Sequence, residues 1–160
     1  METWELVARE RIRDTLAQYT WSGDAFRLEE MLDAFCPDGT LEVRGQPPYV
    51  GRDAIIAFLG GGSGGTDEER RTARLAEAEA AGVRRIVRHS VANLRFVELT
   101  PERATVATYF TVVTQIGLDH CGRYRDTLVP VGDRWLLQHR FVSTDWRAPD
   151  SVMAAPSAVS

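Results

Sequence analysis

The chain has 160 residues, of which 44% are apolar, and this predicts one folded domain with a single core. Its net charge of −4 and lack of a basic tract argue against nucleic acid as a partner, because phosphate binding needs clustered positive charge. It has no apolar run of about 18 residues, and no signal peptide is visible in its first residues, so we expect no membrane association and a cytoplasmic location.

Helices dominate the first part of the chain. Thr3 is expected to cap the first helix, whose apolar residues fall on one stripe at helical spacing. Asp24 is expected to cap the second helix, which the turn residues Cys36–Gly39 end. The predicted helices span residues 3–20, 25–35 and 52–59, with a short strand at 40–43.

Residues 60–82 form an insertion. Five glycines and a serine at Gly60–Gly65 predict a flexible linker. Thr66–Ala81 has helical propensity but only Leu75 as a large apolar residue, so we expect a solvent-exposed helix or a mobile flap. We place a single domain at residues 1–146 and expect the tail, 147–160, to be loose or to act as a lid.

The second half of the chain is rich in β-forming residues. Turn residues separate the runs, and the shortest turn is the hairpin signal Gly132–Asp133. Helices followed by strands predict an α+β domain. We expect a cone-shaped barrel in which a curved antiparallel sheet with N-terminal helices surrounds an internal pocket. The predicted strands span residues 83–99, 104–115, 123–131 and 134–146.

His89 is the leading candidate for proton transfer, because histidine titrates near neutral pH. The alternative is a packed or solvated histidine. Asp24 can act as a helix cap, as a carboxylate that orients a histidine, or as both. Tyr19 lies on the apolar stripe of the first helix, where it can pack in the core or polarise a substrate oxygen. Lysine is absent from the chain, so Schiff-base chemistry on a lysine is excluded.

Other polar residues have simpler interpretations. We expect His120 to be solvated in a turn and His139 to be packed in the last strand. Tyr124 and Asp126 share one strand face, and Arg140 can pair with Asp126 as a structural ion pair or a charged pocket wall. Cys36 and Cys121 lack metal-site spacing, so we predict free thiols and no metal.

The order of these parts resembles the SnoaL-like branch of the NTF2-like superfamily, which also contains scytalone dehydratase and bile-acid 7α-dehydratase. The resemblance covers roughly residues 4–146 and implies an α+β cone with a deep pocket, often in a dimer or trimer. The matching residues are Tyr19 with Asp24, Phe35–Gly39, Gly51–Ile55, His89 with Asn93, Tyr124–Asp126, Trp135–Arg140 and Asp145–Trp146.

The resemblance implies that His89, oriented by Asp24, abstracts a proton beside a carbonyl while Tyr19 stabilises the enolate, without metal or cofactor. Members of this type place another histidine or aspartate on the next strand, where this chain has Tyr109, Phe110 and Thr111. The second acid or base is therefore not identified. The side chains expected to bind substrate are Tyr49, Asn93, Tyr109, Thr111, Tyr124, Asp126 and Arg140.

The leading hypothesis is a cofactor-independent lyase, a dehydratase that acts on a cyclic polyketide-, steroid- or aromatic-like small molecule. An isomerase or cyclase could use the same base to make an enolate. An epoxide hydrolase could use Asp126 and Arg140 as part of a water-activating arrangement. A non-catalytic binding or assembly module of the same fold is the remaining alternative, because fold does not determine function. We expect a homo-oligomer in each case.

Overall fold

The computed structural model describes residues 1–60, 65–151 and 153. Four helices and six strands are present in this part of the chain, in the order α1–α2–β1–β2–α3–α4–β3–β4–β5–β6. The helices are α1 (Thr3–Asp24), α2 (Leu28–Leu32), α3 (Arg52–Leu59) and α4 (Asp67–Ala80). The strands are β1 (Phe35–Val43), β2 (Tyr49–Val50), β3 (Val87–Leu99), β4 (Ala104–Thr114), β5 (Gly117–Val131) and β6 (Arg134–Arg147).

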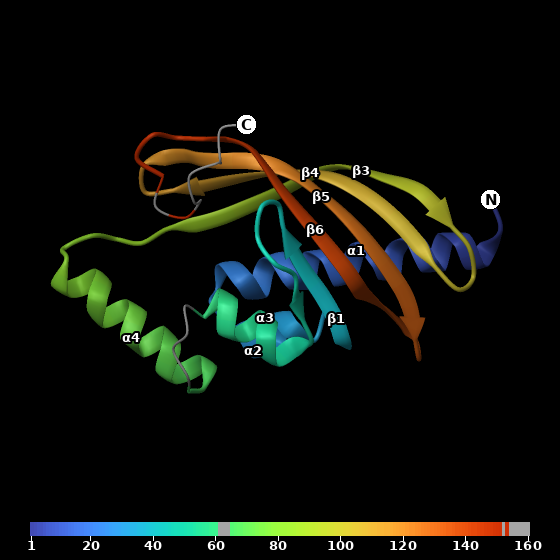
Figure 1. The fold of residues 1–160 in the computed structure, drawn as a ribbon, viewed down its shortest axis with the longest axis horizontal. Coiled ribbons are helices and arrows are strands. Elements are labelled where there is room, and N and C mark those ends of the chain that lie inside the picture. The colour runs from blue at the N-terminus through green and yellow to red at the C-terminus, as the bar shows by residue number, and fades with distance from the viewer. Residues whose placement is uncertain (61–64, 152, 154–160) are drawn as a thin grey trace.

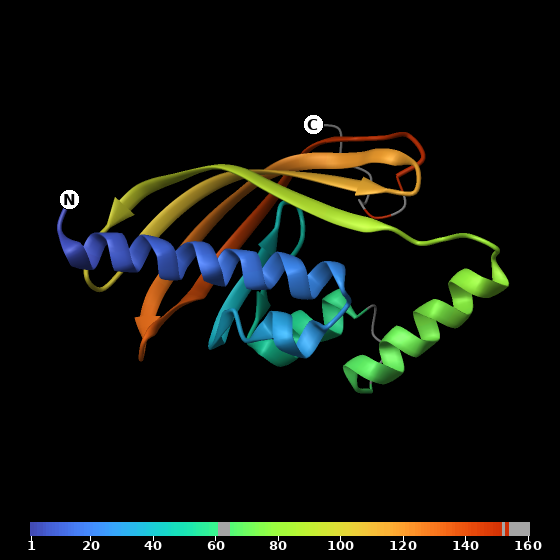
Figure 2. The ribbon, with the colours of Figure 1, turned by 180° about the vertical axis from the view of Figure 1, so that it is seen from behind.

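The strands form one curved sheet in the order β2-β1-β6-β5-β4-β3 (Figure 1). From β6 to β3 the sheet is the expected antiparallel meander, but β1 pairs with β6 in parallel, so the sheet is mixed and not purely antiparallel. Helix α1 runs across its concave face, as Figure 2 shows from behind. The α+β architecture with N-terminal helices on a curved sheet is thus confirmed.

The core lies between α1 and the sheet. The apolar stripe of α1 contributes the buried residues Ala8, Ile12 and Leu16, which face inward at a spacing of four residues. They pack with Val106 and Leu137 from the sheet, both fully buried. Burial of each large aliphatic side chain contributes roughly 1.5–3 kcal/mol, so this contact holds α1 firmly on the sheet.

The ends of α1 differ from the prediction. Glu2, and not Thr3, is the N-cap, in a capping box with Glu5. At the other end α1 continues to Asp24 and closes with Phe26 in the left-handed conformation, φ 56°. The N–H of Arg27 bonds the carbonyl of Ser22, which completes a Schellman motif at a position where glycine is usual. Asp24 therefore does not cap α2.

Residues 35–39 belong to a strand and not to the predicted helix end. Phe35 is fully buried and pairs with Leu137 of β6, and the N–H of Leu137 bonds the carbonyl of Ala34. The pairing with β6 shifts register between Phe35 and Thr40, which leaves Pro37 outside the regular ladder. Tertiary pairing thus overrides the helical pattern, and α2 is only one turn long.

The insertion docks onto the helical layer. Thr66 caps α4 in a capping box with Glu69. The Asp67 carboxylate accepts hydrogen bonds from the backbone N–H groups of Leu28 and Glu29, at 2.9 and 3.0 Å, and so caps α2. The rest of α4 extends away from the sheet (Figure 1). Most of the predicted linker, residues 61–64, lies outside the described part of the chain.

The tail begins as an ordered segment. The N–H of Ala148 bonds the carbonyl of Asp119 at 2.7 Å, and the hydroxyl of Ser151 donates to the Asp119 carboxylate at 2.6 Å. Residue 152 and residues 154–160, where a loose tail or lid was also predicted, lie outside the described residues. No helix among the described residues is long and apolar enough to cross a membrane.

Gly122 lies where β5 passes close to the backbone of β6. A Cβ placed there would overlap the backbone carbonyl of Ser143 and lie 2.9 Å from the ring of Phe110. Because backbone cannot rotate away, we expect Gly122→Ala to lower the free energy of unfolding by about 1–3 kcal/mol. Urea titration measures the loss. Gly23→Ala, where the added methyl would meet only the flexible Met31 side chain, should cost much less. Equal losses would contradict this account.

Candidate active site

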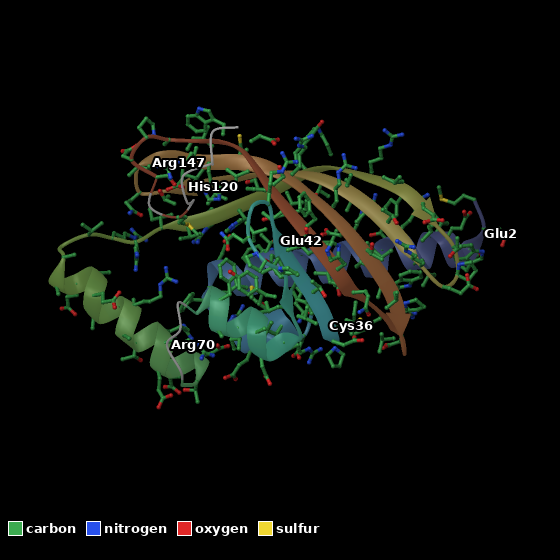
Figure 3. The ribbon with its side chains drawn as sticks, viewed as in Figure 1. Glu2, Cys36, Glu42, Arg70, His120 and Arg147 are labelled. Atoms are coloured by element: carbon green, nitrogen blue, oxygen red, sulfur yellow. The ribbon has the colours of Figure 1, made fainter. Side chains whose placement is uncertain are left out.

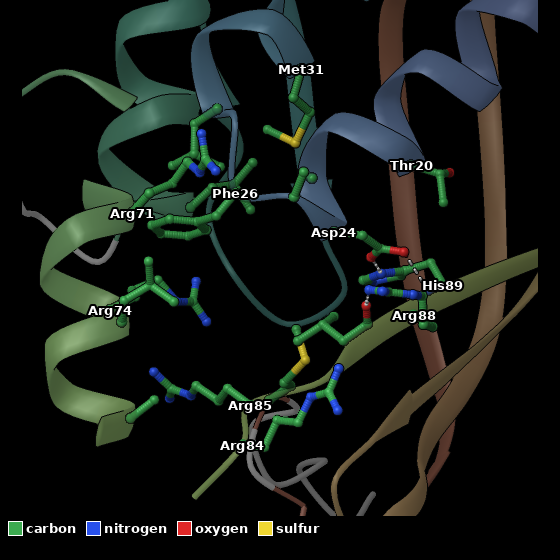
Figure 4. Close-up of a pocket in the computed structure, with 18 of the residues that line it drawn as sticks. Thr20, Asp24, Phe26, Met31, Arg71, Arg74, Arg84, Arg85, Arg88 and His89 are labelled. Carbon is green, nitrogen blue, oxygen red and sulfur yellow. Dashed lines mark hydrogen bonds and ion pairs between the residues drawn. The ribbon is translucent and has the colours of Figure 1, made fainter. Parts of the chain in front are cut away.

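The closest pair of titratable groups at the predicted site is His89 with Asp24. The His89 Nδ1 atom lies 2.5 Å from one oxygen of the Asp24 carboxylate. The backbone N–H of His89 donates to the other oxygen at 2.9 Å. Asp24 is the last residue of α1 and His89 lies on the inward face of β3, so the end of the helix and the sheet meet at this pair (Figure 4). The structure therefore brings the two residues together.

This geometry prepares the imidazole for proton transfer. A carboxylate bonded to Nδ1 favours the tautomer with its proton on that nitrogen, which leaves Nε2 as the free lone pair. The exposed fractions of the two side chains are 22% for His89 and 10% for Asp24. The pair is thus sheltered from bulk water but remains within reach of a ligand.

A cavity of about 940 Å³ opens beside this pair, between the end of α1, helix α4 and the start of β3 (Figure 4). Tyr19, Asp24 and His89 all line it. Apolar side chains cover much of the remaining wall. They include Phe26, Leu28, Met31, Leu59, Leu75, Val83, Val87 and Met153. The volume lies within the range of small-molecule sites, so the cavity can enclose a drug-sized ligand.

Arg140 forms a buried stack behind the cavity wall. Its guanidinium lies between the rings of Tyr19 and Tyr124, at 4.1 and 4.3 Å from their centroids. It donates two hydrogen bonds to Asp126, each 2.8 Å, which confirms the predicted pair. Burial disfavours the charge of Arg140, but the carboxylate outweighs this and raises its pKa. Tyr19 is thereby held between a cation and the cavity.

Three of the predicted substrate-binding residues lie in this buried layer. Burial raises the pKa of Tyr124 well above its usual value, so its phenol stays protonated. Neither Tyr124, Asp126 nor Arg140 is among the residues that line the cavity. Their placement behind Tyr19 supports the structural interpretation, in which they position the tyrosine.

The other predicted contacts do not line the cavity at His89, so their role in substrate binding stays a prediction. Tyr109 and Thr111 point to the outer, exposed face of β4, because Phe110 and its alternating neighbours face inward. Asn93 is exposed on β3 with a φ of 53°, at a register shift. Tyr49 stacks on Phe58, with ring centroids 4.1 Å apart.

The family model for the SnoaL-like domain matches residues 4–141. The chain belongs to the SnoaL-like family. No curated protein is similar enough in sequence to match it. The expected resemblance is therefore confirmed at the level of the family.

Solved structures share the fold of this SnoaL-like chain. A candidate scytalone dehydratase from Novosphingobium aromaticivorans is 20% identical over 95% of this chain and 97% of its own, with a TM-score of 0.68. ActVI-ORFA from Streptomyces coelicolor is 18% identical over 86% and 96%, with a TM-score of 0.67. A protein from Catenulispora acidiphila is 25% identical over 89% and 95%, also with a TM-score of 0.67.

A second histidine–aspartate pair lies on the same inner face of the SnoaL-like sheet. His120 belongs to β5, and not to the predicted turn, because the turn comprises only Gln115 and Ile116. It is 8% exposed, and its Nδ1 lies 2.7 Å from Asp119 (Figure 3). Val112 pairs with both His89 and His120, so the histidines flank it on neighbouring strands. The alternation of side chains along a strand would have placed His120 on the inner face only if β5 had been predicted to begin at Gly117.

Burial lowers the pKa of His120, although the hydrogen bond and charge of Asp119 oppose this shift. The unfolded chain therefore binds a proton at higher pH than the native chain does. The contribution of neutral His120 to the free energy of unfolding is complete above about pH 6.5, the pKa of histidine in the unfolded chain. This contribution is lost as the pH falls through the pKa of His120 in the native chain. We expect His120→Asn to flatten the pH dependence of the unfolding free energy below pH ~6.5. Chemical denaturation at several pH values measures it.

His139→Asn is the control, because His139 is only partly buried and bonds Glu42 through Nε2 at 2.9 Å. If both variants kept the full acid sensitivity of the natural chain, burial of His120 would not be its source.

Among the described residues, no three histidine, cysteine, aspartate or glutamate side chains gather closely enough to hold a metal ion.

Proposed function

We propose that this SnoaL-like protein is a cofactor-independent lyase that removes water from a cyclic β-hydroxy carbonyl compound. The observation that supports this most strongly is the His89–Asp24 pair at the wall of the cavity, with Nδ1 and the carboxylate 2.5 Å apart. A general base needs a free nitrogen, a partner that stabilises its charged form, and access to substrate. His89 has all three.

The reaction follows from these positions. His89 Nε2 takes the proton next to the substrate carbonyl, and the C–H electrons form an enolate. The Tyr19 hydroxyl donates a hydrogen bond to the enolate oxygen. As the carbonyl re-forms, the Cα–Cβ double bond is made and the Cβ–O bond breaks. The imidazolium, stabilised by Asp24, returns its proton to the departing hydroxide, which leaves as water.

The shape of the cavity favours a bulky substrate. At about 940 Å³ it is near the upper end of small-molecule sites, and its apolar wall suits a ring system. The SnoaL-like family includes polyketide cyclases and dehydratases. The names of the Novosphingobium and Streptomyces neighbours agree with such chemistry, although at 20% and 18% identity they support the fold alone.

Product analysis tests the proposal. Incubation with a panel of cyclic β-hydroxy ketones in deuterated water should yield a product lighter by one water, and unreacted substrate should exchange its α-proton for deuterium. Retention of mass in the product would identify an isomerase or cyclase instead. Absence of both turnover and exchange across the panel would favour a binding module. The hydrolase alternative has less support, because Asp126 and Arg140 do not line the cavity.

A further inference from the structure

Arginines are concentrated on one side of the cavity. Five of them contribute to its wall, against the acidic residues Asp24 and Glu79, although the chain as a whole carries a net charge of −4. Asp24 already accepts hydrogen bonds from His89. The arginines are Arg71, Arg74, Arg84, Arg85 and Arg88. The cavity is therefore positively charged at this side and apolar elsewhere.

These arginines come from two segments that meet only in the folded chain. Arg71 and Arg74 lie on α4, and the others lie immediately before or at the start of β3. Figure 4 shows Arg74 and Arg85 directed into the space between the two segments. The docking of Asp67 against α2 sets the position of α4, so it also positions this group of charges.

Arg74 and Arg85 are close enough for their positive charges to oppose one another. Partial burial, together with the charge of Arg85, lowers the pKa of Arg74. Arg85 has an ion pair with Glu77 at 3.7 Å, but both side chains are exposed, so the pair is weak. Glu77 is the carboxylate that offsets both charges, and it is exposed. A bound anion would stabilise two neighbouring guanidinium groups further.

Phe26 supplies a second, independent sign of a built site. It holds the left-handed conformation at the end of α1, a backbone conformation that is unfavourable for a non-glycine residue. Its ring lines the cavity, and the guanidinium of Arg74 stacks over it at 3.8 Å from the centroid. The strained backbone thus places an aromatic surface under the arginine and restricts where its charge can lie.

We propose that the substrate is anionic, with Arg74 and Arg85 binding its carboxylate or phosphate group while its carbonyl lies at His89. This assignment of the substrate class rests on the proposed function. Guanidinium groups recognise both anions through paired hydrogen bonds, and the apolar wall accepts the ring system between the two ends. Arg74 on α4 and Arg85 just before β3 therefore select the substrate, and the histidine on β3 acts on it.

Three ligands with one common ring test the proposal without requiring turnover: 2-naphthoate, 2-naphthyl phosphate and the neutral 2-naphthol. Calorimetric titration of the full chain should show that at least one anion binds about tenfold or more tightly than 2-naphthol, the effect expected of charge-assisted hydrogen bonds. Added salt should weaken the binding of the two anions but not that of 2-naphthol. The anion that binds more tightly identifies the group as carboxylate or phosphate. Equal binding of all three would overturn the proposal.

The double variant R74Q/R85Q should lose the preference, while R11Q, an exposed arginine on α1, should keep it. R74K/R85K should restore part of it, which separates lost charge from misfolding. If R74Q/R85Q still bound the anions more tightly than 2-naphthol, the arginines would have another role. The same would follow if the double variant changed only in oligomeric state. Because H89Q should still bind the anions, failure of the lyase proposal and failure of this one are distinguishable.

Discussion

His89→Ala should lower kcat for dehydration by about 10²–10⁴-fold, the contribution of a positioned general base. The KM should change little, because replacing the imidazole by the alanine methyl group does not disturb the rest of the cavity or its arginines. Steady-state kinetics on a β-hydroxy ketone that the protein converts measures both constants. His139→Ala is the matched control, since His139 also pairs with a carboxylate, Glu42, but does not line the cavity.

Asp24→Asn should reduce kcat nearly as much, for a reason visible in the hydrogen bonds. The backbone N–H of His89 needs an acceptor at the position of one Asp24 oxygen. An asparagine that keeps this bond with its carbonyl must present its NH₂ group to Nδ1. The imidazole then carries its proton on Nε2 and cannot act as a base.

The combined variant distinguishes this mechanism from simple loss of structure. Because the two residues act as a unit, Asp24→Asn should add little to the loss already caused by His89→Ala. Full activity in His89→Ala, or losses that multiply in the double variant, would show that the pair does not work in this way. Circular dichroism of each variant establishes that the fold is retained.

Arg140→Met should lower the free energy of unfolding by about 3–5 kcal/mol, because it leaves the Asp126 carboxylate buried without its partner. The side chains of Arg140 and Asp126 are 1% and 0% exposed, so water cannot replace the lost bonds. A loss of this size should reduce Tm by about 10 °C in a chain of this length. Thermal and urea unfolding measure the two quantities.

Arg123→Gln is a closely matched control. Arg123 also holds a carboxylate through two hydrogen bonds, to Asp145 at 2.9 Å each, but on the exposed surface. Its loss should be far smaller, because exposed ion pairs contribute little. Adding Asp126→Leu to Arg140→Met should recover part of the stability by removing the orphaned charge. Equal losses at the two sites would contradict the role of burial.

Local sequence patterns predicted much of the fold. The apolar stripe of α1 and the runs of β-forming residues depend on neighbours a few positions apart, and such patterns survive into the folded state. The same reasoning extended α2 too far and began β5 too late. In both cases strand pairing with β6 or β4 decided the boundary, and pairing joins residues distant in the chain.

The ordered set of Tyr19, Asp24 and His89 was identifiable through the family resemblance, and the Asp126–Arg140 pair through strand alternation. Alternation could not say which face of β4 points inward. That choice is made by α1, whose apolar stripe covers one face of the sheet and leaves Tyr109 outside, 55% exposed. Tyr109 therefore does not line the cavity at His89.

The sequence by itself thus determined the class of fold and the order of the elements, because these follow from local spacing. The candidate residues for proton transfer were implied by the family resemblance. Only the tertiary structure brought Arg74 and Arg85 to one cavity and joined Asp24 to His89. These contacts depend on how α4 and the end of α1 dock, through hydrogen bonds between residues up to 65 positions apart.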